Sequence, residues 1–229
     1  MATRFYFPTD QAVPVAVVPS ASWAIISEVN QGRAVTVRVG TGASASVASA
    51  ATGTPGDNAL VLLFVSDPLA AQTISGTVKG QFSIGQLDPD TDGYSQLILR
   101  VVSGDGATVR GVLLAAHAEP KSSEFWTQPG FRNRKMPLAA ISPASLSSLA
   151  VSEGDRLVFE IGFKSAGTVA DDCDFWYGDA QAIDLPEDET TSQSNRNPWI
   201  ELSGAISFVG AAAPVASGHS SGIGIRLGL

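Results

Sequence analysis

The sequence contains few of the residues from which most catalytic and metal sites are built. Its 229 residues include one cysteine, Cys173, and two histidines, His117 and His219. One cysteine cannot form a disulfide within the chain, and two histidines cannot supply a histidine-rich metal centre. So few cysteines and histidines also argue against a catalytic pair of a nucleophile and its general base. Disulfide-stapled scaffolds and the familiar nucleophilic enzymes are therefore disfavoured.

Charged residues and long apolar runs are also scarce. Only 16% of the residues are charged, against roughly 25% in an average globular chain, which predicts that partners cover part of an uncharged surface. The net charge of −8 disfavours binding to the phosphate backbone of nucleic acids. The longest apolar run, Ala59–Val65, is far shorter than the ~18 residues of a membrane-spanning helix. Pro8 and Asp10 interrupt the apolar N-terminus, so we expect no signal peptide and no membrane insertion.

Apolar residues recur with period two, or in short solid runs, between Gly, Asp, Asn and Pro, which is typical of strands. The pattern predicts strands over Trp23–Val29, Arg33–Val39, Ala59–Val65, Thr73–Ile84, Tyr94–Val102, Thr108–Ala115, Arg156–Phe163, Asp174–Tyr177 and Trp199–Phe208. Hairpin turns are expected at Asn30–Gly32 and Ser103–Ala107. Glu160 is expected to point from its strand towards solvent or a partner.

Helix signals are few. Ser142 and Pro143 resemble an N-cap followed by a first-turn proline, so Ala144–Val151 is expected to form two helical turns at most. Many short strands with almost no helix predict an all-β fold: an antiparallel β-sandwich, jelly-roll-like, with an immunoglobulin-like sandwich as the alternative. We expect one domain that comprises an extended N-terminal arm (1–22), a β-sandwich (23–209) with a loop excursion (40–56), and a flexible C-terminal tail (210–229).

One acidic turn is a candidate calcium site. Asp88, Asp90 and Asp92, followed by Gly93, match the first half of an EF-hand loop, in which alternate carboxylates converge on Ca²⁺. The match fails at Leu99, where the bidentate glutamate belongs. The alternatives are a hydrated acidic turn and a Ca²⁺ site held by these aspartates, and no other cofactor is expected.

A second acidic stretch lies between Lys164 and Arg196, where eight acidic residues occur with no basic residue among them. Three interpretations are open: a hydrated loop, a metal-binding face, or a contact with a basic segment of a neighbouring copy. The charged residues of such an inter-subunit contact are Arg132, Arg134, Lys135, Glu187, Asp188 and Glu189.

Aromatic side chains form another candidate surface, because carbohydrate-binding sandwiches stack sugar rings on exposed Trp and Tyr. The candidates are Trp126, Phe131, Trp176 and Tyr177. If 175–177 lie in a strand, at least one of these three aromatic residues faces outwards. The alternatives are a glycan-binding platform and a set of core or interface anchors.

A hydrolase motif occurs in the C-terminal tail, but its context is wrong. Residues 218–222 match G-x-S-x-G, yet no Asp, Glu or His follows them, as the order of the triad in such hydrolases requires. His117 lies two residues before Glu119 and is expected to be a surface histidine. We therefore expect that the protein is not an enzyme.

Seven short segments between Trp23 and Phe208 carry a resemblance to a known family: Asp67–Gly80, Leu99–Ser103, Thr108–Gly111, Asn133–Lys135, Gly154–Gly162, Asp184–Asp188 and Asn197–Glu201. They resemble virion structural proteins of tailed bacteriophages and related prophages, and no catalytic motif belongs to the resemblance. It implies a non-enzymatic virion component, assembled in the host cytoplasm with other virion proteins. The location is left open between the head, as a capsid decoration, and the tail.

The residues themselves agree with such a role. A β-rich chain that is low in charge and carries Gly/Ala/Ser-rich excursions suits repeated assembly, and we expect a closed homo-oligomer, trimeric or hexameric, held by loops and termini. The alternative is a carbohydrate-binding module that recognises host surface glycans through Trp126, Trp176 or Tyr177. A symmetric oligomer favours the first function, and a monomer that binds glycans favours the second.

Overall fold

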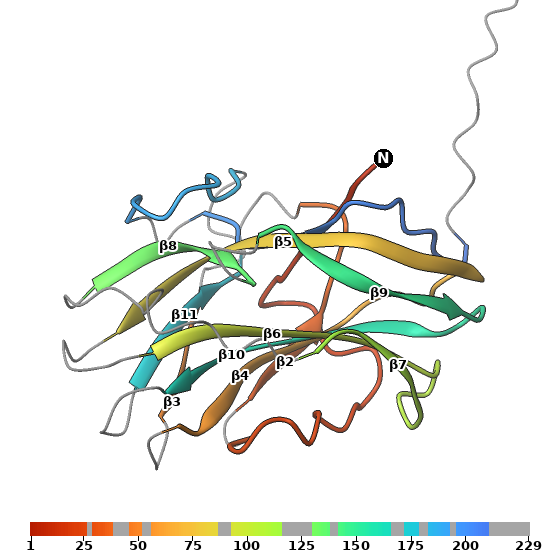
Figure 1. The fold of residues 1–229 in the computed structure, drawn as a ribbon, viewed down its shortest axis with the longest axis horizontal. Helices are drawn as coiled ribbons and strands as arrows, with labels where there is room; N and C mark the ends of the chain where they lie inside the picture. Colours follow the sequence, from red (N-terminus) through yellow and green to blue (C-terminus); the bar gives the residue numbers. More distant parts are fainter. Residues whose placement is uncertain are drawn as a thin grey trace, which may run out of the picture.

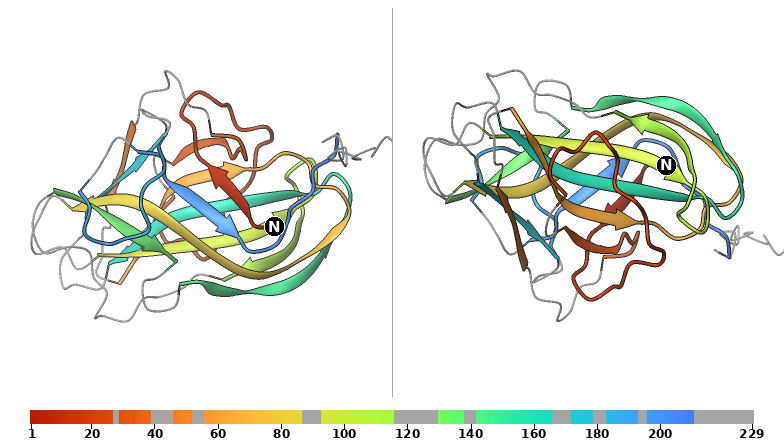
Figure 2. Two further views of the ribbon diagram at one scale, coloured as in Figure 1. Left: turned by 90° about the horizontal axis from the view of Figure 1, so that it is seen from above. Right: turned by 90° about the horizontal axis from the view of Figure 1, so that it is seen from below.

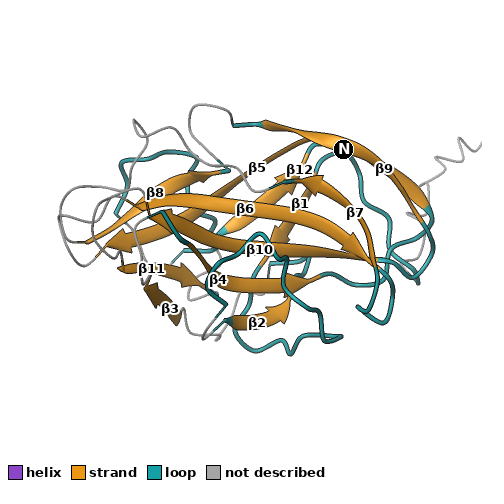
Figure 3. Ribbon diagram, turned by 60° about the horizontal axis from the view of Figure 1, so that its bottom comes forward, coloured by secondary structure: helices purple, strands orange, loops and turns teal. Residues whose placement is uncertain are grey.

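The computed structural model is a sandwich of two β-sheets, and the residues that it describes contain no helix (Figures 1 and 3). The described residues are 1–26, 29–38, 46–51, 56–86, 93–115, 130–137, 142–165, 172–178, 183–192 and 196–210. The predicted all-β sandwich is confirmed. No helix in this part of the chain is long and apolar enough to cross a membrane.

The larger sheet is organised around one long strand, β5 (Gln72–Gln86). Its register pairs it with two strands along one edge, β9 (Ala144–Val151) and β8 (Gly130–Met136). Two more pair along the other edge, β12 (Trp199–Leu202) and β11 (Asp172–Tyr177). Outside these lie β1 (Thr3–Tyr6), next to β12, and β3 (Ser46–Ala51), next to β11. A register shift at Gly76, whose φ is +99°, bends β5, as a bulge with a glycine in the left-handed region does.

The smaller sheet has five strands in the order β2-β4-β10-β6-β7. Their bounds are β2 (Asn30–Arg33), β4 (Asn58–Val65), β6 (Gly93–Val102), β7 (Val109–Leu114) and β10 (Arg156–Ser165). All pairs are antiparallel except β2 with β4. Figure 1 shows this sheet below β5, β8 and β9 of the larger sheet.

One of the two predicted hairpins is confirmed. Between β6 and β7, the Ser103 amide donates to the Thr108 carbonyl at 2.8 Å, and Gly106 has a φ of +78°. The hairpin at Asn30–Gly32 is wrong, because these residues form the parallel edge strand β2. Gly32 serves close packing rather than a turn, since a Cβ there would lie 2.5 Å from the Phe64 ring.

Three other expectations change in the structure. Ala144–Val151 is not helical but forms β9, because pairing with β5 outweighs the local helix-start signal of Ser142 and Pro143. The excursion expected over 40–56 contains the strand β3, paired with β11. The strand expected over Trp199–Phe208 ends at Leu202, and Phe208 makes only an isolated bridge to Leu69.

The segment expected as an N-terminal arm lies against the sandwich. Phe5 and Phe7 are buried in the main core, which fills the space between the two sheets. Farther along, Val17 and Trp23 join a second cluster on the outer face of the smaller sheet, with Leu60, Leu63, Val65, Ile98, Val102 and Val158. Figure 2 (right) shows the N-terminal segment crossing this face. The smaller sheet is therefore buried on both sides.

Gly162 of β10 allows this close approach, because an added Cβ would collide with the Ala59 carbonyl oxygen and lie 2.9 Å from the Trp23 ring. We expect Gly162→Ala to lower the free energy of unfolding by about 1–3 kcal/mol, as overpacking of a core does. Urea unfolding measures this loss. The matched control is Gly204→Ala, whose Cβ would meet its nearest atom at 3.6 Å and which should change stability by less than ~0.5 kcal/mol. Equal effects would contradict the packing account.

Candidate functional site

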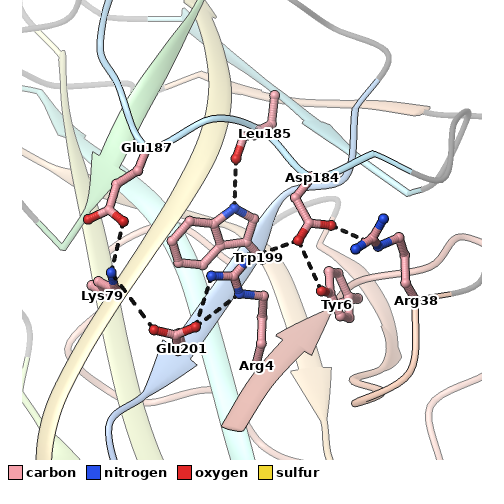
Figure 4. A network of polar contacts seen from close by, with 9 residues as sticks. All are labelled: Arg4, Tyr6, Arg38, Lys79, Asp184, Leu185, Glu187, Trp199 and Glu201. Carbon is pink, nitrogen blue, oxygen red and sulfur yellow. Dashed lines mark hydrogen bonds and ion pairs between the residues drawn. The ribbon is translucent and has the colours of Figure 1, made fainter. Parts of the chain in front are cut away.

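A network of charged side chains surrounds Trp199 on the outer face of the larger sheet (Figure 4). Trp199 and Glu201 point outwards from β12 because they alternate with Ile200 and Leu202, which belong to the main core. The Arg4 guanidinium lies 3.9 Å from the centre of the Trp199 ring and 2.8 Å, through Nη2, from Glu201 Oε2. The Trp199 ring is 1% exposed, so this stacking closes the outer face of β12.

The same network fastens the segment 183–188 to the sheet. Asp184 Oδ2 accepts hydrogen bonds from Arg4 Nη1 at 2.7 Å and from the Tyr6 hydroxyl at 3.2 Å. Arg38 Nε lies 2.9 Å from the other carboxylate oxygen of Asp184. The Leu185 carbonyl accepts a bond from Trp199 Nε1 at 2.9 Å. Residues from both ends of the chain thus hold one loop in place.

Farther along β5, Lys79 extends the network. Its Nζ lies 2.8 Å from Glu187 Oε2 and 3.8 Å from Glu201 Oε1. With Arg4 and Arg38 on Asp184 and Glu201, each carboxylate drawn in Figure 4 has a cationic neighbour. These three carboxylates thus take part in ion pairs that join segments of the fold.

Two titratable groups of this network have shifted pKa values. Burial lowers the pKa of Arg4, but hydrogen bonds to Glu201 and Asp184 outweigh it, and the net pKa is raised. Burial and the charge of Asp184 raise the pKa of Tyr6. Both shifts keep the proton in place at neutral pH. Neither group is thereby prepared to exchange a proton with a substrate.

A second polar cluster is fully buried under the N-terminal segment. Glu160 of β10 is 0% exposed and accepts bonds through Oε1 from Arg100 Nη2 at 2.6 Å and from the Ser20 amide at 2.9 Å. Its Oε2 accepts a bond from Trp23 Nε1 at 2.8 Å, and Arg100 also donates to the Val18 carbonyl. The expectation that Glu160 points to solvent or a partner is wrong, because residues of its own chain cover this outward face.

The charged residues expected to bridge two copies lie close together within one chain. Asp188 Oδ1 accepts bonds from the Thr191 amide at 3.0 Å and from Asn133 Nδ2 of β8 at 3.4 Å. The Lys135 amide donates to Glu189 Oε1 at 3.4 Å, and Glu187 pairs with Lys79 as described above. The acidic segment therefore packs on the basic strand β8 of the same molecule.

Arg132 and Arg134 occupy the alternate positions of β8, opposite Ile84 and Phe82 of β5, and both are half-buried. They lie on the face of β8 opposite to the one that the acidic segment covers, since successive side chains of a strand alternate. A contact between copies through these residues stays a prediction.

The aromatic candidates separate into two environments. Tyr177 is 9% exposed, belongs to the main core and donates its hydroxyl to Asn30 Oδ1 at 3.2 Å. Trp176 points outwards, as the alternation along 175–177 predicts, and is half-buried. Its ring meets that of Phe131 edge to face, with the centroids 5.2 Å apart. Trp126 lies outside the described residues.

Several sequence candidates cannot be placed. Asp88, Asp90 and Asp92, both histidines and the motif at 218–222 lie outside the described residues. Within the described ranges, no group of three or more His, Cys, Asp or Glu side chains is arranged to hold a metal ion. Cys173 is buried in the main core and, as the one cysteine of the chain, takes part in no intramolecular disulfide.

An open groove of about 380 Å³ lies where the described chain ends. Its charged residues are Arg33 and Asp67, which form an ion pair at 2.5 Å. The other lining residues are Thr36, Pro68, Phe208, Val209 and Gly210. No sequence motif indicated this groove, since β2 and the bridge of Phe208 to Leu69 assemble it from distant segments.

Comparison with known proteins assigns no family: no family model and no curated protein matches the chain. Among solved structures, two crystal structures of a CocE/NonD family hydrolase from Staphylococcus aureus align with TM-scores of 0.31 and 0.29, at 10% and 11% identity. The alignments cover 89% and 90% of this chain but 34% and 35% of those chains, so this chain spans about a third of their length. A likeness this weak carries no argument about activity.

The buried ion pair leads to a stability prediction. We expect Glu160→Gln to lower the free energy of unfolding by about 3–5 kcal/mol, because the Arg100 charge is left unpaired in a dry site. Urea unfolding measures the loss, and limited proteolysis should cut the segment 13–22 sooner than in the wild type. Glu187→Gln breaks the exposed pair with Lys79 and serves as the control, with an expected change under ~1 kcal/mol. A loss no larger than that of the control would contradict a stabilising role for the buried ion pair.

Asp188 leads to a prediction about pH. Burial raises the pKa of this carboxyl, but hydrogen bonds from Thr191, Thr190 and Asn133 lower it by more, so the net pKa is lowered. A lowered folded-state pKa stabilises the fold at pH values above the unfolded-state pKa of about 3.9. This stabilisation is lost as the pH falls through the folded-state pKa. Asp188→Asn should therefore be less stable than wild type at pH 7, and the difference should shrink below about pH 4. Thermal unfolding from pH 7 to pH 2.5 tests this, and a constant difference would contradict it.

Proposed function

We propose that the protein is a non-enzymatic structural component of a bacteriophage virion, associated with the head or the tail, which assembles with copies of itself. The observation that carries the proposal is the use of the polar side chains. In the described part of the chain, the charged clusters around Trp199 and Glu160 fasten chain segments onto the two sheets. Polar side chains used in this way stabilise the shape of the molecule, which suits a subunit of a larger assembly.

Two further features support assembly. Among the described residues, β7 and β3 each pair with one strand only, as do β1, β2, β8 and β9, so both sheets have strand edges without a paired neighbour. On β7, Val109 and Val112 are 53% and 45% exposed. An open edge with exposed valines favours pairing with another chain. The phage context rests on the resemblance of the seven segments given above.

A carbohydrate-binding module for host surface glycans is the second candidate function. The observation that favours it is the pair of half-buried rings, Phe131 and Trp176, on the outer face of the larger sheet. Tyr177 supports it less, because a ring buried in the core offers no face to a sugar. The two functions are compatible on one virion protein.

Assembly is tested by light scattering on the protein after size-exclusion chromatography. We expect a mass of at least two copies of the 23.6 kDa chain, and ring-like or closed particles in negative stain. Val112→Glu should weaken assembly, because it places a charge at the open edge of β7. Val37→Glu, the same change at an exposed valine outside the strands, is the control. A persistent monomer that binds glycans would favour the second function instead.

The virion role needs its own experiment. Antibodies raised against the folded protein should label phage particles at repeated positions in electron micrographs. Particles that remain unlabelled, while a major capsid antibody labels them, would overturn the virion role without touching the oligomeric state.

A further inference from the structure

Four polar atoms on the outer face of the larger sheet are buried and have no hydrogen-bond partner. They are Gln81 Oε1, Ser83 Oγ, Asn133 Oδ1 and Trp176 Nε1. Gln81 and Asn133 are 0% exposed and Ser83 is 1% exposed. Native proteins leave few such groups unpaired, because each unpaired group costs about 1–3 kcal/mol. A concentration of four in one place therefore points to something that binds them.

The strand register brings these four groups together. Trp176 of β11 lies opposite Ser83 of β5, and Ser83 lies opposite Asn133 of β8. Opposite residues of antiparallel strands share a face, with Cβ atoms about 4.5–5.5 Å apart. Gln81 is two residues before Ser83 on β5 and shares that face too. Ser83 thus stands at the centre of a polar row, with Asn133 and Trp176 on either side.

The orientation of the two amides is set by the acidic segment. Gln81 donates its amide nitrogen to the Asp188 carbonyl, and Asn133 donates its amide nitrogen to Asp188 Oδ1 at 3.4 Å. Each amide therefore keeps its carbonyl oxygen for another donor. The polar row presents two acceptors from these amides, one donor from the Trp176 indole, and one hydroxyl that does either.

This set of donors and acceptors limits which chemical class of ligand can bind. A metal cation would meet the indole N–H of Trp176, and an anion would meet the carbonyl oxygens of Gln81 and Asn133, so neither fits the whole row. An apolar group would leave all four atoms unpaired. A neutral oxygen that accepts from Trp176 and Ser83 and donates to the amide oxygens satisfies the row.

We propose that Gln81, Ser83, Asn133 and Trp176 form a binding site for a neutral hydroxyl oxygen, supplied by a water molecule or by a carbohydrate. A water molecule has the two lone pairs and two protons that the four groups require, and adjacent hydroxyls of a sugar offer the same set. Beside the row, Gly85 has no side chain on β5, so Phe131 reaches across the strand to the Trp176 ring. These two half-buried rings supply the apolar surface that a sugar ring would need. The site does not depend on the proposed assembly.

A high-resolution crystal structure tests the site directly. Crystals are grown without any polyol, and a second set is soaked in galactose, glucose and N-acetylglucosamine separately. An isolated oxygen within ~3.2 Å of at least three of the four atoms in the sugar-free crystals supports the site with water as its source. A sugar hydroxyl at that position in the soaked crystals supports it with carbohydrate as the source. The site is overturned if both sets show the four atoms bonded to protein groups alone.

Two variants test the shared ligand in solution. Trp176→Phe keeps a ring and removes the N–H, and Ser83→Ala removes the hydroxyl. Each should lower the thermal midpoint by about 2–4 °C. Because one bound oxygen links the two groups, the double variant should lose less than the sum of the single losses. Ser147→Ala, exposed on β9, is the control and should leave the midpoint unchanged. Strictly additive losses would contradict a shared oxygen.

Discussion

The Glu160–Arg100 ion pair lies on a face of the smaller sheet that would otherwise be open to water. Glu160 has no exposed surface, and both of its oxygens accept hydrogen bonds, from Arg100, the Ser20 amide and Trp23. A buried charge of this kind is tolerated only when it is paired and fully hydrogen-bonded. The pair therefore requires the N-terminal segment to stay in place, and that segment in turn covers the apolar outer face of β4, β6 and β10. Burial of the outer face of this sheet therefore depends on this charge being satisfied as well as on the apolar contacts of Val17 and Trp23.

The larger sheet uses the same principle with charges that are less buried. Its outer face carries Trp199, which is covered by Arg4 and by the loop that Asp184 and Leu185 anchor. Beyond Lys79, the acidic segment continues over β5 and β8, where Asp188 orients the amides of Gln81 and Asn133. Segments remote in sequence are thus tied to both outer faces by polar contacts. The consequence is that the charged groups of these two clusters in the described chain serve its own fold.

This use of the charged groups is the basis of the proposed structural role. An enzyme needs polar groups that are free to bind and to exchange protons with a substrate, whereas the carboxylates of the Trp199 network each have a cationic neighbour. A building block needs a stable shape and edges or patches for its neighbours. For the proposed structural role, the edge of β7 that has no paired strand among the described residues and the half-buried rings of Phe131 and Trp176 are the candidate contact sites.

Sequence alone determined the all-β class and the positions of the long strands, because period-two alternation and solid apolar runs are local signals of strands buried on one or both faces. The runs around Leu62, Ile98 and Phe159 predicted β4, β6 and β10 to within a few residues. Only the tertiary structure decided what happens at the outer faces and edges. Whether Glu160 meets water or Arg100, and whether 144–151 forms a helix or the strand β9, depends on segments far away in the chain. The physical reason is that alternation tells which side of a strand a residue faces, but not what covers that side.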